Sequence, residues 1–126
     1  MFPAELKYTK DHEWLKAEAG NRVRVGITSF AQQELGDVVF VELPEQGAAI
    51  KAGDSFAVVE SVKAVSDIYT PVGGNIVEVN QTLADQPELI NEDPYGQGWI
   101  AIIEMNNPAE LAGLMNADDY KKLIDG

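Results

Sequence analysis

The residue whose type and position first indicate chemistry is Lys63. It lies in the stretch VVESVKAVSDIYTP, residues 58–71, between two short runs of β-branched side chains. Between Arg24 and Lys121 the only other basic residue is Lys51. The amine of a lysine is a common site of covalent acylation. An enzyme that reads this stretch therefore meets one amine, which predicts a function for it.

Few other side chains can do chemistry of their own. The chain has no cysteine, which excludes a disulfide, a thiolate nucleophile and a thiolate metal site. His12 is the only histidine, and beside Glu13 in a stretch of strand character it is expected to be a half-exposed strand residue. Glu92 and Asp93 offer two carboxylates at a proline turn, too few ligands for a hard cation. We therefore expect a protein that is not an enzyme and holds no metal.

The composition is that of a single soluble, folded domain over residues 1–126. Apolar residues make up 45% of the chain and charged residues 24%. Nine Lys and Arg against 21 Asp and Glu give a formal net charge of -12, which repels nucleic acid phosphates and anionic lipids. We expect no nucleic acid and no membrane as partners, and favour proteins with basic docking patches. The N-terminal residues lack the features of a signal or transit peptide, which predicts a cytoplasmic protein.

Two local structures compete for the stretch ESVKAVSD around the lysine. In a helix, Glu60 and Asp67 would flank Lys63 as ordinary surface pairs, each stabilising by roughly 0.2 to 0.5 kcal/mol. The flanking residues, however, are strand formers and Pro71 ends the run, so a hairpin that turns at Lys63-Ala64 fits better. Two-residue hairpin turns prefer Asn-Gly, Asp-Gly or Gly-Gly, which tolerate positive φ. The unfavourable Lys-Ala pair indicates a functional tip from which the lysine projects into solvent.

The elements that must position this hairpin are short strands. Alternating segments broken by turn residues run to about Met105. Besides the two strands of the hairpin, whose first covers residues 55–62, we expect strands at residues 6–16, 22–27, 37–43, 75–80 and 99–105. Residues 44–54 are predicted to form a loop, and residues 83–98 to be irregular with one helical turn.

Helical signals are confined to two places. The stretch TSFAQQELG predicts one short helix, in which Ser29 and Gln32 form a capping box and Gly36 is the C-cap. From Asn107 the pattern is helical again, with Asn107 as the cap and Pro108 at the first helical position. We therefore expect a helical C-terminal extension over about residues 107–125.

An internal echo indicates two related halves. Residues 36–41 read GDVVFV and residues 74–79 read GNIVEV, so a similar strand follows a similar turn on each side of the lysine stretch. A small sandwich built from two halves has this pattern, although glycine followed by alternating valines is also common by chance in β proteins.

Several sequence blocks together resemble the H protein of the glycine cleavage system. They are YTKDHEW, VGIT, LGDVVFVELP, ESVKAVSDIYTPVGG, ELINEDPYGQGW and DDYKKL, in family order from about residue 6 to residue 123. The resemblance implies a mainly β fold, a lipoyl-domain-like barrel-sandwich hybrid. This is a flattened β-barrel of two related halves, with a short internal helix and C-terminal helices. We expect a monomer, and the lack of a presequence indicates a bacterial cytoplasm, or the mitochondrial matrix for a processed organellar form.

By this resemblance Lys63 carries lipoate in amide linkage, and Glu60 and Ala64 help a lipoate-attaching enzyme to recognise the hairpin. The lipoyl arm accepts an aminomethyl group from glycine decarboxylase, the P protein with pyridoxal phosphate. The aminomethyltransferase, the T protein with tetrahydrofolate, takes over the one-carbon unit. The dihydrolipoyl dehydrogenase, the L protein with FAD, then reoxidises the arm. The chain is thus expected to be a carrier of glycine catabolism rather than a catalyst.

The resemblance also implies that the loaded arm docks in a surface cleft that protects it from water. At matching positions, Glu13 and Asp67 offer carboxylates to the cationic amine of the cargo; equally, both fit ordinary solvated strand carboxylates. Some relatives have a histidine where this chain has Glu34, so a role that needs that histidine does not carry over. The NEDPYG block is typical of the family, and we interpret it as structural, with Tyr95 and Trp99 in the core.

Four alternatives differ in what they require. A lipoyl domain of a 2-oxoacid dehydrogenase usually has Asp before the lysine, where this chain has Val62, and lacks the DHEW and NEDPYG blocks. A biotin carrier usually places its lysine between methionines. An H-like protein that serves as lipoate donor or scaffold for other lipoyl proteins, and a purely structural β protein, are the remaining two.

Overall fold

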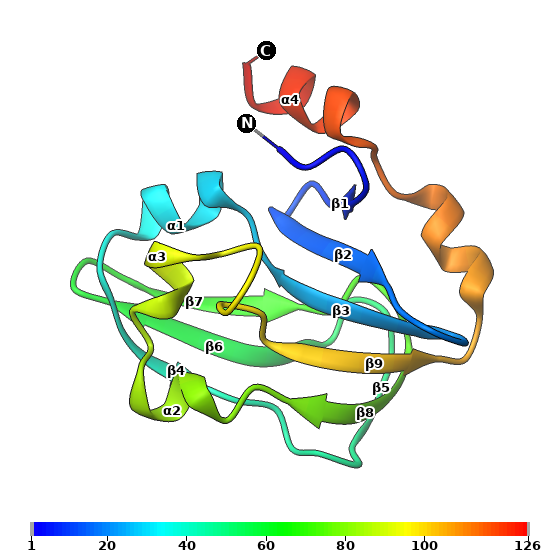
Figure 1. Cartoon of the computed structure of the whole chain (residues 1–126), viewed down its shortest axis with the longest axis horizontal. Helices are drawn as coiled ribbons and strands as arrows, with labels where there is room; N and C mark the ends of the chain where they lie inside the picture. The colour runs from blue at the N-terminus through cyan, green and yellow to red at the C-terminus, as the bar shows by residue number, and fades with distance from the viewer. Residues whose placement is uncertain (1, 126) are drawn as a thin grey trace.

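The computed structural model describes residues 2–125 and shows a mainly β chain (Figure 1). Two antiparallel sheets make up the body, one with strand order β1-β2-β3-β9-β8-β5 and one with order β4-β6-β7. The strands are β1 Lys7–Tyr8, β2 Glu13–Ala17, β3 Arg22–Ile27, β4 Val38–Glu42, β5 Ala49–Ile50, β6 Ser55–Ser61, β7 Val65–Tyr69, β8 Gly74–Val79 and β9 Ala101–Met105. The expectation of a mainly β fold is confirmed.

The main core lies between the two sheets. Alternate residues of the strands point inward, and the buried aliphatic side chains come from both sheets, among them Val25, Val41, Val59, Ile76 and Ile103. Burial of apolar side chains at about 25 cal/mol per Å² is the main stabilising force for such a body. The core is continuous across both sheets, as a flattened barrel requires.

The echoed segments form one strand in each sheet. β4 follows Gly36 and pairs with β6 at the edge of its sheet, whereas β8 begins at Gly74 and lies between β9 and β5. In both pairs the register shifts three residues after the glycine, at Val39 between β4 and β6 and at Val77 between β8 and β9. A β-bulge at the same position of both segments supports the prediction of two related halves.

The short helix α1, Ser29–Leu35, forms where the sequence predicts it, but its cap differs. The N-cap is Thr28, whose extended backbone precedes the helix and whose hydroxyl accepts a hydrogen bond from the Ala31 amide at 3.2 Å. The predicted capping box from Ser29 is therefore wrong by one residue. The C-cap is Gly36, as predicted, with a φ of 81° that favours glycine.

The two segments expected to be irregular hold short elements. Residues 83–98 contain part of α2, Thr82–Asp85, and α3, Leu89–Glu92, so two helical turns form instead of one. The predicted loop at residues 44–54 includes β5, which pairs with β8. A two-residue strand is too short to show an alternating pattern, which is why the sequence does not reveal it.

The C-terminal extension is helical in two pieces. Asn107 caps a 3₁₀ helix, η1 Pro108–Gly113, and its side-chain oxygen accepts a hydrogen bond from the Ala109 amide. α4, Ala117–Asp125, follows and lies against the N-terminal segment (Figure 1). The Tyr120 ring of α4 stacks on Tyr8 with centroids 4.9 Å apart. No helix in residues 2–125 is long and apolar enough to cross a membrane.

Candidate functional site

The lysine stretch is a β-hairpin, and the alternative of a helix is excluded. β6 and β7 pair antiparallel with Glu60 opposite Val65. Beyond this pair, the Ser61 amide donates to the Ala64 carbonyl at 2.8 Å and closes the turn. The two residues at the tip are therefore Val62 and Lys63, so the predicted centre at Lys63-Ala64 is wrong by one position.

The turn is held by a serine that the sequence analysis did not single out. The Ser61 hydroxyl accepts from the amides of Lys63 at 3.1 Å and Ala64 at 3.0 Å, and donates to the Ala64 carbonyl at 3.2 Å. Among the described non-glycine residues only His12 has a positive φ, so the tip does not need the glycine or asparagine that a mirror-image turn requires. A serine before a turn is the local signal that was available for this arrangement.

The Lys63 side chain is exposed. Its methylene groups lie next to the corner where α1 ends and β4 begins. A Cβ atom at Gly36 would lie 3.4 Å from the Lys63 Cε, so the lysine stem runs close to this glycine. The Val62 amide donates to the Asp37 carbonyl at 3.0 Å, which ties the hairpin tip to the same corner. The direction of the lysine therefore depends on how this corner is held.

Asn91, in the NEDPYG block, holds the corner from the other side. Its amide nitrogen donates to the Gly36 carbonyl at 2.9 Å and to the Gln32 side-chain oxygen at 3.0 Å. Its oxygen accepts from the Val38 amide at 2.8 Å. One half-buried side chain thus satisfies polar groups on both sides of the α1–β4 corner. This gives the block a structural role, as the sequence analysis expected, and identifies the residue that has it.

Tyr95 and the proline of the same block add two further ties. The Tyr95 hydroxyl accepts from the Ser29 amide at 2.9 Å at the start of α1. The Pro94 carbonyl accepts from the Trp14 indole nitrogen at 2.9 Å on β2. Tyr95 and Trp99 are only partly buried and pack against the aromatic cluster near the termini, so they lie at the edge of the core.

A hollow of about 270 Å³ adjoins α1 and β7 beside this corner. The residues that line it include the acidic Asp11 and Glu34, with Asp67 at its border, together with apolar residues of α1 and the strands. Asp67 is exposed and its carboxylate accepts a hydrogen bond from the Ser55 hydroxyl at 3.2 Å. This hollow can therefore accept an elongated apolar group with a positive charge at its end. Asp11, which the sequence analysis did not consider, is part of it.

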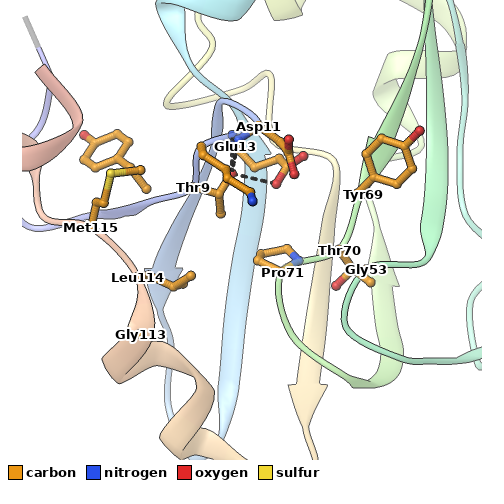
Figure 2. Close-up of a pocket in the computed structure, with 12 residues that line it drawn as sticks. Thr9, Asp11, Glu13, Gly53, Tyr69, Thr70, Pro71, Gly113, Leu114 and Met115 are labelled. Carbon is orange, nitrogen blue, oxygen red and sulfur yellow. Dashed lines mark hydrogen bonds between the residues drawn. The ribbon is translucent and has the colours of Figure 1, made fainter. Parts of the chain in front are cut away.

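A second hollow of about 440 Å³ contains Glu13 (Figure 2). It lies between the segment before β2, the end of β7 and the chain that joins η1 to α4. Figure 2 shows the Glu13 carboxylate beside Asp11, with Tyr69 and Pro71 on the opposite side. Glu13 is only 2% exposed, and its carboxylate accepts a hydrogen bond from the Thr9 hydroxyl at 2.8 Å.

Burial controls the protonation of Glu13. It raises the pKa of this carboxyl to about 7, and the hydrogen bond from Thr9 offsets only part of the effect. The charge of Asp11 raises the pKa further, and the backbone amide of Tyr69 lowers it. Near neutral pH, therefore, Glu13 is divided between a charged and a neutral form.

The predicted site residues are not all brought together. Lys63, Ala64 and Glu60 are exposed at the hairpin, Asp67 lines the smaller hollow and Glu13 lines the larger one. Asp11 lines both, so the two hollows adjoin at this residue.

His12 borders the smaller hollow from a bend before β2 rather than from a strand, contrary to expectation. It is half-buried, with a φ of 71°, and its Nδ1 lies 2.8 Å from the Tyr120 hydroxyl. Burial lowers the pKa of this imidazole, against the charges of Asp11 and Glu34. The histidine therefore joins the N-terminal segment to α4.

A flattened barrel of two sheets that presents an exposed lysine at the tip of a braced hairpin has the architecture of a carrier domain. The glycine cleavage H-protein family model matches residues 6–126. The chain belongs to this family, whose members are lipoyl carriers.

Individual relatives cover almost the whole chain. The glycine cleavage system H protein of Carboxydothermus hydrogenoformans is 55% identical over 125 residues, which cover 99% of this chain and 95% of the relative. That of Symbiobacterium thermophilum is 60% identical over 118 residues, covering 94% and 91%. The crystal structure of a glycine cleavage system H protein from Mycobacterium marinum matches with a TM-score of 0.89 at 42% identity, over 99% of this chain and 100% of that one. The barrel-sandwich fold expected for the family is thereby confirmed.

Replacing Asn91 should loosen the hairpin as well as the fold. Asn91→Ala leaves the Val38 amide and the Gly36 carbonyl without their partner, so we expect the free energy of unfolding to fall by about 2 kcal/mol. The Val62 amide should exchange its hydrogen faster, because its acceptor on Asp37 is no longer held. Hydrogen exchange followed by NMR measures this, with the exposed Asn106→Ala as control. Unchanged exchange at Val62 in a destabilised variant would show that Asn91 does not hold the hairpin.

The raised pKa of Glu13 makes stability depend on pH. The folded state binds the proton more tightly than the unfolded state, whose pKa is near 4.5. The resulting stability is fully present below pH 4.5 and is lost as the pH rises through about 7. Relative to Glu13→Gln, which does not titrate, the wild type should lose roughly 2 to 3 kcal/mol between these limits. Urea unfolding across this range tests the expectation, with the exposed Glu5→Gln as control. Parallel pH profiles of wild type and Glu13→Gln would contradict it.

Proposed function

We propose that this chain is the lipoyl-bearing shuttle of the glycine cleavage system, with lipoate in amide linkage on Lys63. It carries an aminomethyl group from glycine decarboxylase to the aminomethyltransferase, and dihydrolipoyl dehydrogenase restores it for the next cycle. The observation that carries the proposal is the single exposed lysine at the hairpin tip of a chain in this family. The relatives named above are bacterial, and we place the shuttle in the bacterial cytoplasm as a monomer.

The residues around Lys63 fit a lipoyl group. The lysine stem lies over a glycine, where no side chain obstructs it, and the turn is braced by Ser61. When bound, the lipoyl group supplies a redox-active pair of sulfurs, which a chain without cysteine does not have, and a reach on the order of 12 to 15 Å. The hairpin contributes direction, because the Asp37 carbonyl holds the Val62 amide next to the attachment point. The domain can therefore remain outside an active site that the arm enters.

The carboxylates of the smaller hollow are suited to hold a cationic cargo close to the domain. Asp67 borders this hollow and has an exposed carboxylate, and Asp11 and Glu34 add negative charge. We assign to Asp67 the contact with the amine. Glu13 sits in the adjoining hollow with a pKa raised to about 7 by burial, so its contribution depends on pH. Exclusion of water by the apolar wall of α1 then slows hydrolysis of the cargo.

The attachment site is tested by mass. Protein isolated from its native source should carry one lipoyl group, and the Lys63→Arg variant should carry none, because the guanidinium does not form the amide. Intact mass spectrometry measures both, and Lys51→Arg serves as a matched control that should keep the group. A native protein without the modification would remove Lys63 from the proposal.

The shuttle role and the guarding role are separated by one reconstitution. Lipoylated protein is loaded by glycine decarboxylase, and the release of the aminomethyl group is then timed. We expect Asp67→Ala and Glu13→Ala to speed the release several-fold, the first at all pH values and the second only where Glu13 is charged. Asp54→Ala, at an exposed turn, is the control. Equal rates would eliminate the guarding role, whereas a lipoylated protein that is never loaded would favour a lipoate donor or scaffold.

A further inference from the structure

Most of the exposed apolar surface of this protein belongs to the three-stranded sheet that ends in the Lys63 hairpin. Within residues 2–125, six large hydrophobic side chains are exposed, and five of them belong to the three-stranded sheet or its hairpin tip. These five are Val39, Phe40, Val62, Val65 and Tyr69. The sixth, Leu123, is on α4. Exposed apolar side chains that gather on one face usually mark an interaction surface.

The outer face of the sheet arranges these residues in rows. Phe40, Glu60 and Val65 lie directly opposite one another on β4, β6 and β7, and all three are exposed. The next row is Glu42, Val58 and Asp67. Residues opposite one another in an antiparallel sheet share a face. Phe40 at 53% and Val65 at 68% exposure therefore flank Glu60 on the solvent side of the hairpin that ends in Lys63.

The bulge in β4 contributes to this surface. Regular alternation would place only one of Val39 and Phe40 outside, but the register shift at Val39 exposes both. The strand thus gives up the burial of a large side chain next to the attachment point. In the corresponding bulge of β8, the residue after Val77 is Glu78, a charged residue of the kind usually found at exposed positions.

The charge on the same face is of one sign. Acidic residues lie between and beside the apolar ones, at Asp37, Glu42, Glu60 and Asp67, and all four are exposed. Lys63 is the only basic residue between Asp37 and Tyr69 apart from Lys51, which lies in a turn outside the three strands. A partner that fits this face therefore offers an apolar depression bordered by Lys and Arg.

The short distance between the Lys63 amine and the sheet indicates which partner enzyme contacts this face. The Lys63 nitrogen lies at most on the order of 6 Å from its Cα, so an enzyme that acylates it must cover the neighbouring side chains. Enzymes that work at the far end of the finished arm can stay on the order of 12 to 15 Å away. The side chains nearest to Lys63 are therefore best placed to be read by the acylating enzyme.

We propose that Phe40, Val62 and Val65, with Glu60 between them, form the docking surface for the enzyme that attaches the lipoyl group. This inference rests on the proposed attachment at Lys63. In the reaction, the deprotonated amine attacks the carbonyl carbon of an activated lipoyl acyl group, an acyl nucleotide or a thioester. The carbon–nitrogen bond of the amide forms, the bond to the nucleotide phosphate or thiol breaks, and the amine proton goes to solvent. Phe40 acts on recognition and touches no reacting atom.

Kinetics of lipoylation test the surface directly. Unmodified protein is incubated with a lipoate–protein ligase, lipoate and ATP, and the initial rate is measured by intact mass at several protein concentrations. Phe40→Thr and Val65→Thr both place threonine, a β-branched residue that favours strands, at the position. We expect each to lower kcat/KM about tenfold or more, mainly through KM, and Glu60→Gln to reduce the salt dependence of KM. Leu123→Gln removes an equally exposed hydrophobic side chain on α4 and should leave kcat/KM unchanged.

Each other outcome counts against the surface. If Phe40→Thr and Val65→Thr behave like Leu123→Gln, the enzyme does not read this face. If sedimentation shows a dimer that Phe40→Thr dissociates, a second copy of the chain covers the face instead. Thermal unfolding of each variant confirms that it is folded, and Val62→Thr, at the exposed tip, provides a third test that does not alter a strand. Failure of the wild type itself to be lipoylated at Lys63 would instead overturn the attachment on which the inference rests.

Discussion

The arrangement of the attachment site depends on one side chain, Asn91, which holds the corner between α1 and β4. Its three hydrogen bonds join the Gln32 side chain of α1, the glycine C-cap and the first residue of β4. The hairpin tip is in turn tied to this corner through the Asp37 carbonyl, and the lysine stem passes over Gly36. A buried or half-buried amide of this kind is costly to leave unpaired, so the corner has one favourable geometry. The backbone of the hairpin tip is therefore held in place, and only the Lys63 side chain is free to move.

Negative charge is distributed so that it serves different purposes on different faces. On the three-stranded sheet that ends in Lys63, acidic residues alternate with exposed apolar side chains. The acidic residues attract a basic partner, and the apolar side chains give it a surface to cover. At the smaller hollow, three acidic residues lie around a space that can receive a cation. Glu13 is almost completely buried, and its charge therefore varies near neutral pH, in contrast to an exposed carboxylate. The acidic residues that make up the net charge thus lie in three different environments.

Much of the fold followed from local patterns, and the errors have local causes. The β-branched flanks of Lys63 predicted the hairpin, and Gly36 predicted the end of α1. The cap at Thr28 was missed because its role depends on an extended backbone that Tyr120, from the far end of the chain, stabilises through a hydroxyl contact of 2.8 Å. The turn centre was misplaced by one residue because the Ser61 side chain, rather than a positive φ, makes this tip stable. β5 was not predicted because a strand of two residues is too short to show an alternating pattern of apolar and polar residues.

The sequence by itself determined the lone lysine, its strand-forming flanks, the acidic balance and the absence of thiols, because each of these is a property of residue type or of near neighbours. It also determined the family, since blocks in a fixed order over the whole chain rarely coincide by chance. Only the tertiary structure decided that Glu13 is buried and Asp67 exposed, and that five exposed apolar side chains belong to the three-stranded sheet and its hairpin tip. It alone connects Asn91 to Val38, 53 positions away, and His12 to Tyr120, 108 positions away. Burial and long-range hydrogen bonds depend on which segments the chain brings together, and no local period records that.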